Sequence, residues 1–196
     1  MESKMMPTMV NGLDQDALFD TLEAVKKDPK IAKFVFRAKN HWQTGGVNET
    51  VIKDYYGVGE EHCRPGGFHL VNDEPPELLG TDKAPNPVEY VLHAMAGCIT
   101  TSLIAHATAR GIRIDEVATQ FSGDLDVQGF LGLDPKVRNG YQAVKVELFV
   151  KGDADAATLE ALGHFARSRS PVFDIVTNGV PVSLEVTAEP SAAAAA

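Results

Sequence analysis

The residues best suited to chemistry in this sequence are its two cysteines, Cys63 and Cys98. A cysteine reacts as its thiolate, which needs positive charge close by. Cys98 lies three residues after Met95 and seven after Val91, a helical spacing that predicts a side chain turned toward packed structure. No cation stands within one helical turn of it, so a charge partner has to come from elsewhere in the fold. Three arginines are available for that role: Arg37, Arg64 and Arg169. The alternative is that Cys98 is a small buried hydrophobic residue.

Cys63 lies in a polar, glycine-bounded loop at 61–67, beside His62 and Arg64. That neighbourhood could lower the pKa of the thiol, and the alternative is an unreactive surface cysteine. His62, Cys63 and His69 could also be considered as metal ligands, but their spacing matches no standard zinc pattern. The sequence contains no nucleophile elbow, phosphate-binding loop or dinucleotide fingerprint. We therefore expect neither a metal nor a cofactor.

Glu89 is the acidic residue nearest to Cys98 on the same predicted helix. The two are nine residues apart, which at about 100° per residue puts them on opposite faces, about 13–14 Å apart along the axis. Glu89 therefore cannot touch Cys98 within its own helix. It can cap the helix start, or it can serve a site on a neighbouring chain.

The element that positions Cys98 is a long helix predicted over 87–110. Asn86 is a good N-cap, and Pro87 suits the first helical position. Arg110 followed by Gly111 is typical of a helix end. The middle of the helix is crowded with small residues, which let neighbours approach closely: Ala94, Ala96, Gly97, Thr100, Thr101 and Ser102. We therefore place this helix at the centre of the fold.

The remaining elements follow from periodicity and turn residues. Helices are expected at 14–27 and 155–169, and strands at 33–42, 47–56, 68–71, 117–127, 144–150 and 180–187. Loops are expected at 72–85 and 128–140. The order is βββ-α-ββ-α-β after an N-terminal helix, an α+β fold with mainly antiparallel strands. We divide the chain into a helical appendage at 1–30, a main domain at 31–188 and a low-complexity tail at 189–196.

Length and composition fit a single globular domain of 196 residues, with 44% hydrophobic and 23% charged residues. Lysine and arginine number 18 against 27 acidic residues, a net charge of −9, which argues against nucleic acid or an anionic membrane as partner. The start of the chain lacks the pattern of a signal peptide, and polar residues interrupt the longest apolar run, at 90–109. Two cysteines are too few for a disulfide scaffold. We expect a cytoplasmic protein.

Several motifs resemble the osmotically inducible protein C (OsmC) and organic hydroperoxide resistance superfamily. They are Asn86-Pro87-Val88-Glu89, Ala96-Gly97-Cys98, Gly111-Ile112 and Ser170-Pro171-Val172, and the resemblance spans about 33–187. The order of elements given above agrees with the fold of that family. The resemblance implies antiparallel sheets wrapped around central helices in an intertwined homodimer, with two active sites at the dimer interface.

In typical members of that family, a peroxidatic cysteine in the central helix attacks the O–O bond of an organic hydroperoxide. A second cysteine then resolves the sulfenic acid as a disulfide, and a dithiol reduces it. By this resemblance Cys98 takes the peroxidatic position, while Ser170 stands where the second cysteine would be. Glu89 falls near the family's glutamate at the helix start, but the residue directly after the proline is Val88. Arg37 and Arg64 both remain candidates for the arginine that orients the thiolate.

The resemblance therefore implies a redox protein of the oxidative stress response, a thiol peroxidase that acts through Cys98. Its sulfenic acid would be reduced by an outside thiol or resolved by Cys63. One alternative is a non-enzymatic binding protein that holds a small hydrophobic ligand in the dimer-interface cavity, because a fold does not fix a function. Another is a different thiol chemistry in the same cavity.

Overall fold

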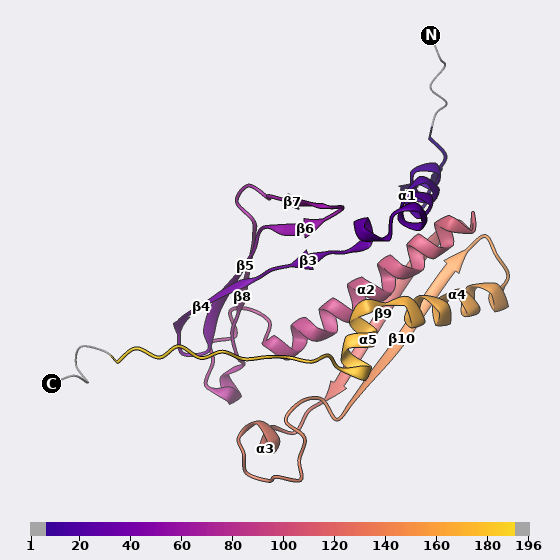
Figure 1. The fold of residues 1–196 in the computed structure, drawn as a ribbon. Helices are drawn as coiled ribbons and strands as arrows, with labels where there is room; N and C mark the ends of the chain where they lie inside the picture. The colour runs from indigo at the N-terminus through magenta and orange to yellow at the C-terminus, as the bar shows by residue number, and fades with distance from the viewer. Residues whose placement is uncertain (1–6, 191–196) are drawn as a thin grey trace.

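The computed structural model describes residues 7–190 (Figure 1). Its helices are α1 (Gln15–Lys27), α2 (Pro87–Ala109), α3 (Val127–Phe130), α4 (Ala156–Arg169) and α5 (Pro171–Asn178), with short 3-10 turns at Pro29–Ala32 and Pro76–Leu78. Its strands are β1 (Met9–Val10), β2 (Leu13–Asp14), β3 (Val35–Phe36), β4 (Lys39–Thr44), β5 (Val47–Ile52), β6 (Tyr55–Gly57), β7 (Glu60–His62), β8 (Phe68–Asn72), β9 (Ile114–Asp124) and β10 (Ala143–Gly152). The chain is a mixed α+β protein with antiparallel pairing, as predicted.

Helix α2 runs through the middle of the molecule, between the N-terminal strands and the layer formed by β9, β10 and α4 (Figure 1). Its start is the expected capping box. The Asn86 side chain accepts a hydrogen bond from the Glu89 amide at 2.9 Å, and the Glu89 carboxylate accepts one from the Asn86 amide at 2.9 Å. The helix ends at Arg110, followed by Gly111 with φ +70°. Both predicted ends are therefore confirmed.

The core lies between α2 and α4. Four α2 side chains spaced four residues apart are almost wholly buried: Met95, Ile99, Leu103 and Ala107. Leu162 and Ala166 of α4 complete the core with Leu103 and Ala107. This spacing gives one continuous stripe along a helix, so α2 and α4 bind each other through matching faces.

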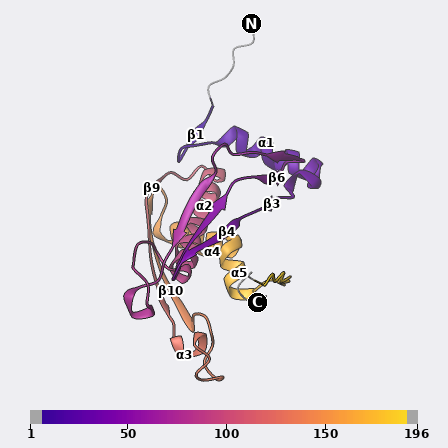
Figure 2. The same cartoon turned by 90° about the vertical axis from the view of Figure 1, so that its left-hand side faces the viewer.

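The hairpin of β9 and β10 covers these helices from one side. Its antiparallel register runs from Ala143 opposite Asp124 to Gly152 opposite Ile114, with an irregularity at Lys151/Gly152. The expected alternation is confirmed, since every second residue from Val117 on β9 and from Val144 on β10 is half-buried. Figure 2 shows the α3 loop, which joins the two strands, at the far end of the hairpin from α1.

Apart from the short β1–β2 pair, the N-terminal strands form two small sheets, with orders β4-β5-β8 and β3-β6-β7. The predicted strand over 33–42 is therefore divided into β3 and β4, and the one over 47–56 into β5 and β6. The reason is that β3 pairs with β6 while β4 pairs with β5, so the chain changes sheet within each predicted strand. Periodicity alone does not report such a change of partner.

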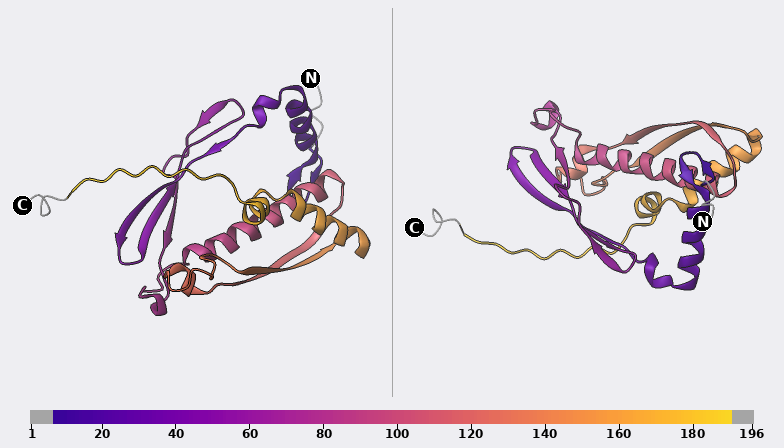
Figure 3. Two further views of the ribbon diagram at one scale, coloured as in Figure 1. Left: turned by 60° about the horizontal axis from the view of Figure 1, so that its bottom comes forward. Right: turned by 90° about the horizontal axis from the view of Figure 1, so that it is seen from above.

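The strand predicted over 180–187 is absent, which corrects the sequence expectation: within the described residues, 179–190 have no regular structure. Figure 3 shows this segment running extended past the N-terminal strands. Its alternating apolar side chains are 55% to 86% exposed: Val180, Val182, Leu184 and Val186. A strand needs a neighbour for its backbone groups, and in the part of the chain that the structure describes this segment pairs with no strand. Ahead of it, α5 ends at Asn178, followed by Gly179 at φ +69°. The tail expected beyond Pro190 lies outside the described residues.

Residues at the start of the described chain fasten the end of α2 to β9. Asn11, at φ +51°, donates a hydrogen bond to the Ile112 carbonyl at 2.9 Å and accepts one from the Ile114 amide at 2.8 Å. Gln15 donates to the Thr108 carbonyl at 2.7 Å. These bonds satisfy backbone groups at the end of α2 and in the turn that follows.

We expect Asn11→Ala to lower the free energy of unfolding by about 2 kcal/mol, because two part-buried backbone groups lose their partner. Alanine also tolerates positive φ less well than asparagine. Urea titration measures the change. Asn139→Ala is a matched control, since Asn139 is exposed and its side chain makes no hydrogen bond with the described residues. Equal stability of the two variants would contradict an anchoring role for Asn11.

Asp73 organises the loop that leads into α2. Its buried carboxylate accepts hydrogen bonds from the Thr81 hydroxyl at 2.6 Å and from three backbone amides, those of Glu74, Thr81 and Lys83. These bonds, that of the Thr81 hydroxyl first, lower the pKa of Asp73 from 3.8 to about 2.

Because the folded-state pKa of Asp73 lies below its unfolded value, its stabilising effect is complete above pH 3.8 and is lost as the pH falls toward about 2. We therefore expect Asp73→Asn to be less stable than the unmodified protein at neutral pH. The difference should shrink on acidification through that window. Denaturant unfolding at a series of pH values tests this, and a difference independent of pH would show that the Asp73 charge plays no part.

Candidate functional site

Cys98 lies in the middle of α2, beside the buried stripe rather than within it. It is half-buried and unpaired, and it directly precedes the core residue Ile99. The adjoining exposed side of the helix carries small residues, among them Ala94, Gly97 and Thr101. A Cβ placed on Gly97 would meet no atom within 4 Å. Another molecule can therefore approach the helix closely next to the thiol.

The structure holds both candidate orienting arginines away from α2. Arg37 forms a two-pronged ion pair with Glu61, at 2.7 and 2.8 Å, and this pairing lowers the pKa of the Glu61 carboxyl. Arg64 stacks over the ring of Tyr55, at 4.5 Å, and lies 5.4 Å from that of Phe68. Within residues 7–190 neither guanidinium forms an ion pair or hydrogen bond with α2. The single chain thus brings neither of them to Cys98.

Glu89 is engaged in the capping box described above, and a site role for it within this chain finds no support. It also influences its neighbours at the helix start. Its charge adds to burial in raising the pKa of Tyr141, whose hydroxyl donates to the Val88 carbonyl at 2.9 Å. Burial, then Asp73 and Glu89, raise the pKa of Glu74 as well. Acidic side chains therefore gather at the N-terminus of α2. Cys98 lies in the middle of the helix, away from them.

The interpretation in which its neighbourhood lowers the pKa of Cys63 is wrong. A hydrogen bond to the Asp54 carboxylate raises that pKa, and burial and the Asp54 charge act in the same direction. Arg64 does not offset this, because its guanidinium lies on the aromatic rings. The Cys63 thiol is therefore exposed but stays protonated at neutral pH, which makes it a poor nucleophile.

The two histidines near Cys63 have other partners. The His62 ring stacks on Tyr55 with centroids 4.6 Å apart and is hydrogen-bonded to the Gly57 carbonyl. His69 is paired with the Glu49 carboxylate at 2.6 Å, which raises the pKa of the imidazole. In the part of the chain that the structure describes, no three histidine, cysteine or acidic side chains come together as a metal site.

Ser170 is buried at the junction of α4 and α5. It is the N-cap of α5, and its hydroxyl accepts a hydrogen bond from the Phe173 amide at 3.2 Å. The α5 helix packs against α2, so the serine lies on an element that contacts the helix of Cys98. A hydroxyl in this position caps a helix well but cannot form a disulfide.

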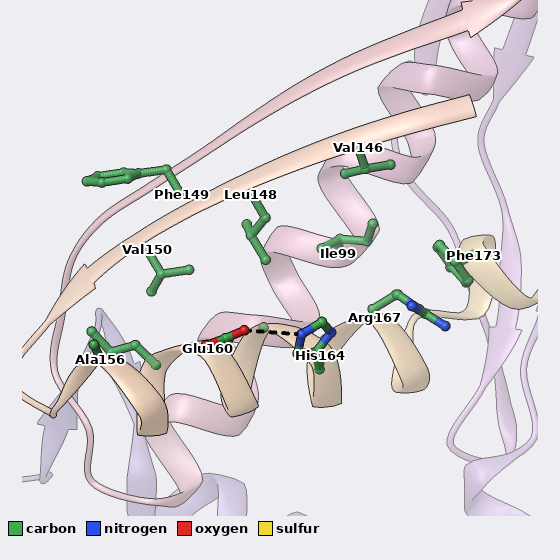
Figure 4. A pocket seen from close by; sticks show the side chains of 12 residues that line it. Ile99, Val146, Leu148, Phe149, Val150, Ala156, Glu160, His164, Arg167 and Phe173 are labelled. Atoms are coloured by element: carbon green, nitrogen blue, oxygen red, sulfur yellow. Dashed lines mark ion pairs between the residues drawn. The ribbon is translucent and has the colours of Figure 1, made fainter. Parts of the chain in front are cut away.

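A groove lies between α4 and β10, and the sequence motifs did not predict it (Figure 4). It encloses about 580 Å³ and has an apolar floor that includes Ile99, Leu148 and Val150. Glu160 and His164 lie on its α4 side, with Glu160 Oε1 3.8 Å from His164 Nε2. The alternation of β10 and the helical spacing of α4 are the signals from which it could have been found. Ile99 is the α2 residue that lines the groove, and its neighbour Cys98 is not among the lining residues.

A family model described as OsmC-like protein matches residues 80–185, which is more than half of the chain. Among solved structures, the chain is similar to an OsmC-like protein from Mycoplasma pneumoniae, with a TM-score of 0.58 and 13% identity over 74% of this chain and 88% of that one. It is also similar to the organic hydroperoxide resistance protein OsmC from Legionella pneumophila, with a TM-score of 0.52 and 19% identity over 74% of this chain and 90% of that one. No curated protein matches the sequence.

Proposed function

Since the chain belongs to the OsmC-like protein family, we propose that it reduces organic hydroperoxides through Cys98, as a one-cysteine thiol peroxidase of the oxidative stress response. The observation that carries this proposal is the position of Cys98, half-buried in the middle of α2 beside an open face of small residues. The Legionella protein of the same fold is named for organic hydroperoxide resistance, which supports the substrate class.

The reaction balances with an outside thiol as reductant. The Cys98 thiolate attacks one oxygen of the O–O bond, the bond breaks, and the alcohol leaves after it takes up a proton. The cysteine is then a sulfenic acid. One outside thiol displaces water from it to form a mixed disulfide, and a second releases Cys98 as the thiol. Ser170 cannot replace the first outside thiol, and the raised pKa of Cys63 makes that residue a poor substitute. A reducing compartment such as the cytoplasm would supply the reductant.

The active unit in this proposal is a homodimer, whose second copy supplies the charge that Cys98 lacks in one chain. Two observations support it. By length and composition alone α2 could cross a membrane, and only 17% of its most apolar 18-residue window is buried within the chain. Exposed alternating apolar residues also occupy 180–187. A second copy that covers both surfaces would bury them without lipid, and it would bring another Arg37 or Arg64 to the interface.

Binding of a small hydrophobic ligand is the second candidate function. It is favoured by the apolar groove of about 580 Å³ beside α2 and by the serine at position 170. In that case Cys98 would be a packing residue, with no oxidation chemistry.

Mass spectrometry after brief oxidation separates these functions. Reduced protein is exposed to one equivalent of cumene hydroperoxide in the presence of dimedone, which traps sulfenic acids. We expect a single adduct on Cys98, lost in Cys98→Ser and retained in Cys63→Ser. A disulfide between Cys98 and Cys63 would instead identify Cys63 as the resolving thiol. An unmodified Cys98 would refute the peroxidase and leave ligand binding as the function.

A further inference from the structure

The ends of α2 and α4 bring two arginines to one phenyl ring. The Arg110 guanidinium carbon lies 4.5 Å from the centroid of the Phe165 ring, and that of Arg169 lies 5.3 Å from it. The His106 ring meets the same phenyl group edge-on, with centroids 4.8 Å apart. Because α2 and α4 pack through the core, this arrangement is held by the fold rather than by a loop.

The positive charge of this cluster is unbalanced. In residues 7–190 no carboxylate forms an ion pair with Arg110 or Arg169, whereas Arg37 and Arg113 each have an acidic partner. The chain as a whole carries a net charge of −9, whereas here two arginines without an ion pair share one phenyl ring. Burial, and then the charges of these two arginines, lower the pKa of His106. Within residues 7–190 no carboxylate forms an ion pair with this imidazole that would favour its protonated form.

Two structural roles account for part of this arrangement. A cation at a helix C-terminus is favourable, and an arginine gains from stacking on an aromatic ring. Neither role uses the N–H donors at the edge of the guanidinium, of which each arginine has five. No hydrogen bond from either side chain is found within the described residues, so these donors remain available to a ligand.

We propose that Arg110, Arg169 and His106 form a binding site for an anionic group, a carboxylate or a phosphate. Each planar guanidinium on this ring presents paired N–H donors that match the oxygens of such a group. The neutral imidazole adds a third hydrogen-bonding group. His106 lies eight residues beyond Cys98, about 12 Å along the helix axis, so the site is separate from the thiol and independent of its chemistry.

Histidine NMR with inorganic phosphate as the probe tests the site. The His106 resonance, assigned with His106→Gln, is followed through a pH titration with and without phosphate. We expect a saturable shift with a Kd of about 1 mM and a rise of about 1 in the pKa of His106, because a bound anion favours the imidazolium. Arg110→Gln/Arg169→Gln should abolish both effects. Arg113→Gln/Arg138→Gln, which removes the same charge elsewhere, should retain them.

The anionic group can belong to a free small molecule or to an acidic side chain of a second copy of the chain. A phosphate response independent of protein concentration identifies the free anion. A His106 shift that follows protein concentration without phosphate, together with weaker self-association of Arg110→Gln/Arg169→Gln, identifies the second copy. If the His106 resonance shifts with neither phosphate nor protein concentration, the proposal is wrong. This measurement uses the unmodified protein, so it does not depend on whether the variants fold.

Discussion

Val182→Asp/Leu184→Asp is expected to convert a dimer of twice 21.1 kDa into a monomer. The two side chains are 86% and 85% exposed in the single chain and lie on one side of an extended segment. Among residues 7–190, strand β10 pairs only with β9, so its other edge can accept a strand from a second copy. The free energy needed to bury two carboxylates in this apolar contact would exceed the free energy that the contact contributes to association. Sedimentation equilibrium at micromolar concentration measures the mass.

The matched control places the same two charges on the opposite side of the segment, as Ser183→Asp/Thr187→Asp. This variant should remain dimeric, because alternate residues of a strand point to opposite faces. Dissociation of both variants alike would show that the apolar alternation specifies no interface. A mass of 21.1 kDa for the unmodified protein would remove the dimer from the proposed function altogether.

The elements that the sequence predicts well are those whose signals are local. The α2 helix carries its own start in Asn86 and Glu89 and its own end in Gly111, so its bounds follow without knowledge of the rest of the fold. The existence of the β9–β10 hairpin is also predicted from two alternating runs that flank a turn-rich loop, but β9 covers Ile114–Asp124 rather than 117–127, and Val127 begins α3. Each of these patterns depends on residues within a few turns or one strand pair.

The features that the sequence did not predict depend on distant partners. Periodicity predicts a strand over 180–187, which is wrong for the single chain, because a strand exists only when another strand pairs with it. The pKa of Cys63 depends on Asp54. The neighbouring Arg64 does not lower it, because its guanidinium stacks on the Tyr55 ring. The pairing of Arg37, the residue directly after β3, with Glu61 of β7 likewise joins residues that are distant in sequence. Residue types near a cysteine in sequence therefore say little about its charge environment.

Ser170→Cys is expected to create a resolving thiol for Cys98. The side chain at 170 lies at the junction of α4 and α5, and α5 packs against the helix of Cys98. After one equivalent of cumene hydroperoxide the variant should lose two hydrogens and form a disulfide between Cys98 and the new cysteine. Turnover with a small dithiol should rise about tenfold, because a tethered thiol reacts at a high effective concentration. Intact-mass spectrometry and a hydroperoxide consumption assay measure the two effects.

The same substitution removes the cap of α5, so we expect it to lower the free energy of unfolding by about 1 kcal/mol. Ser168→Cys controls for the added thiol, since Ser168 is exposed on α4 and should give neither the disulfide nor the faster turnover. Dimedone adducts on Cys98 without a disulfide in Ser170→Cys would show that the two positions do not meet. The peroxidase would then depend entirely on outside thiols, and the serine at 170 would be explained by its cap alone. A disulfide would instead show that the fold retains the geometry of a two-cysteine cycle, and that one oxygen-for-sulfur difference is what prevents the chain from using it.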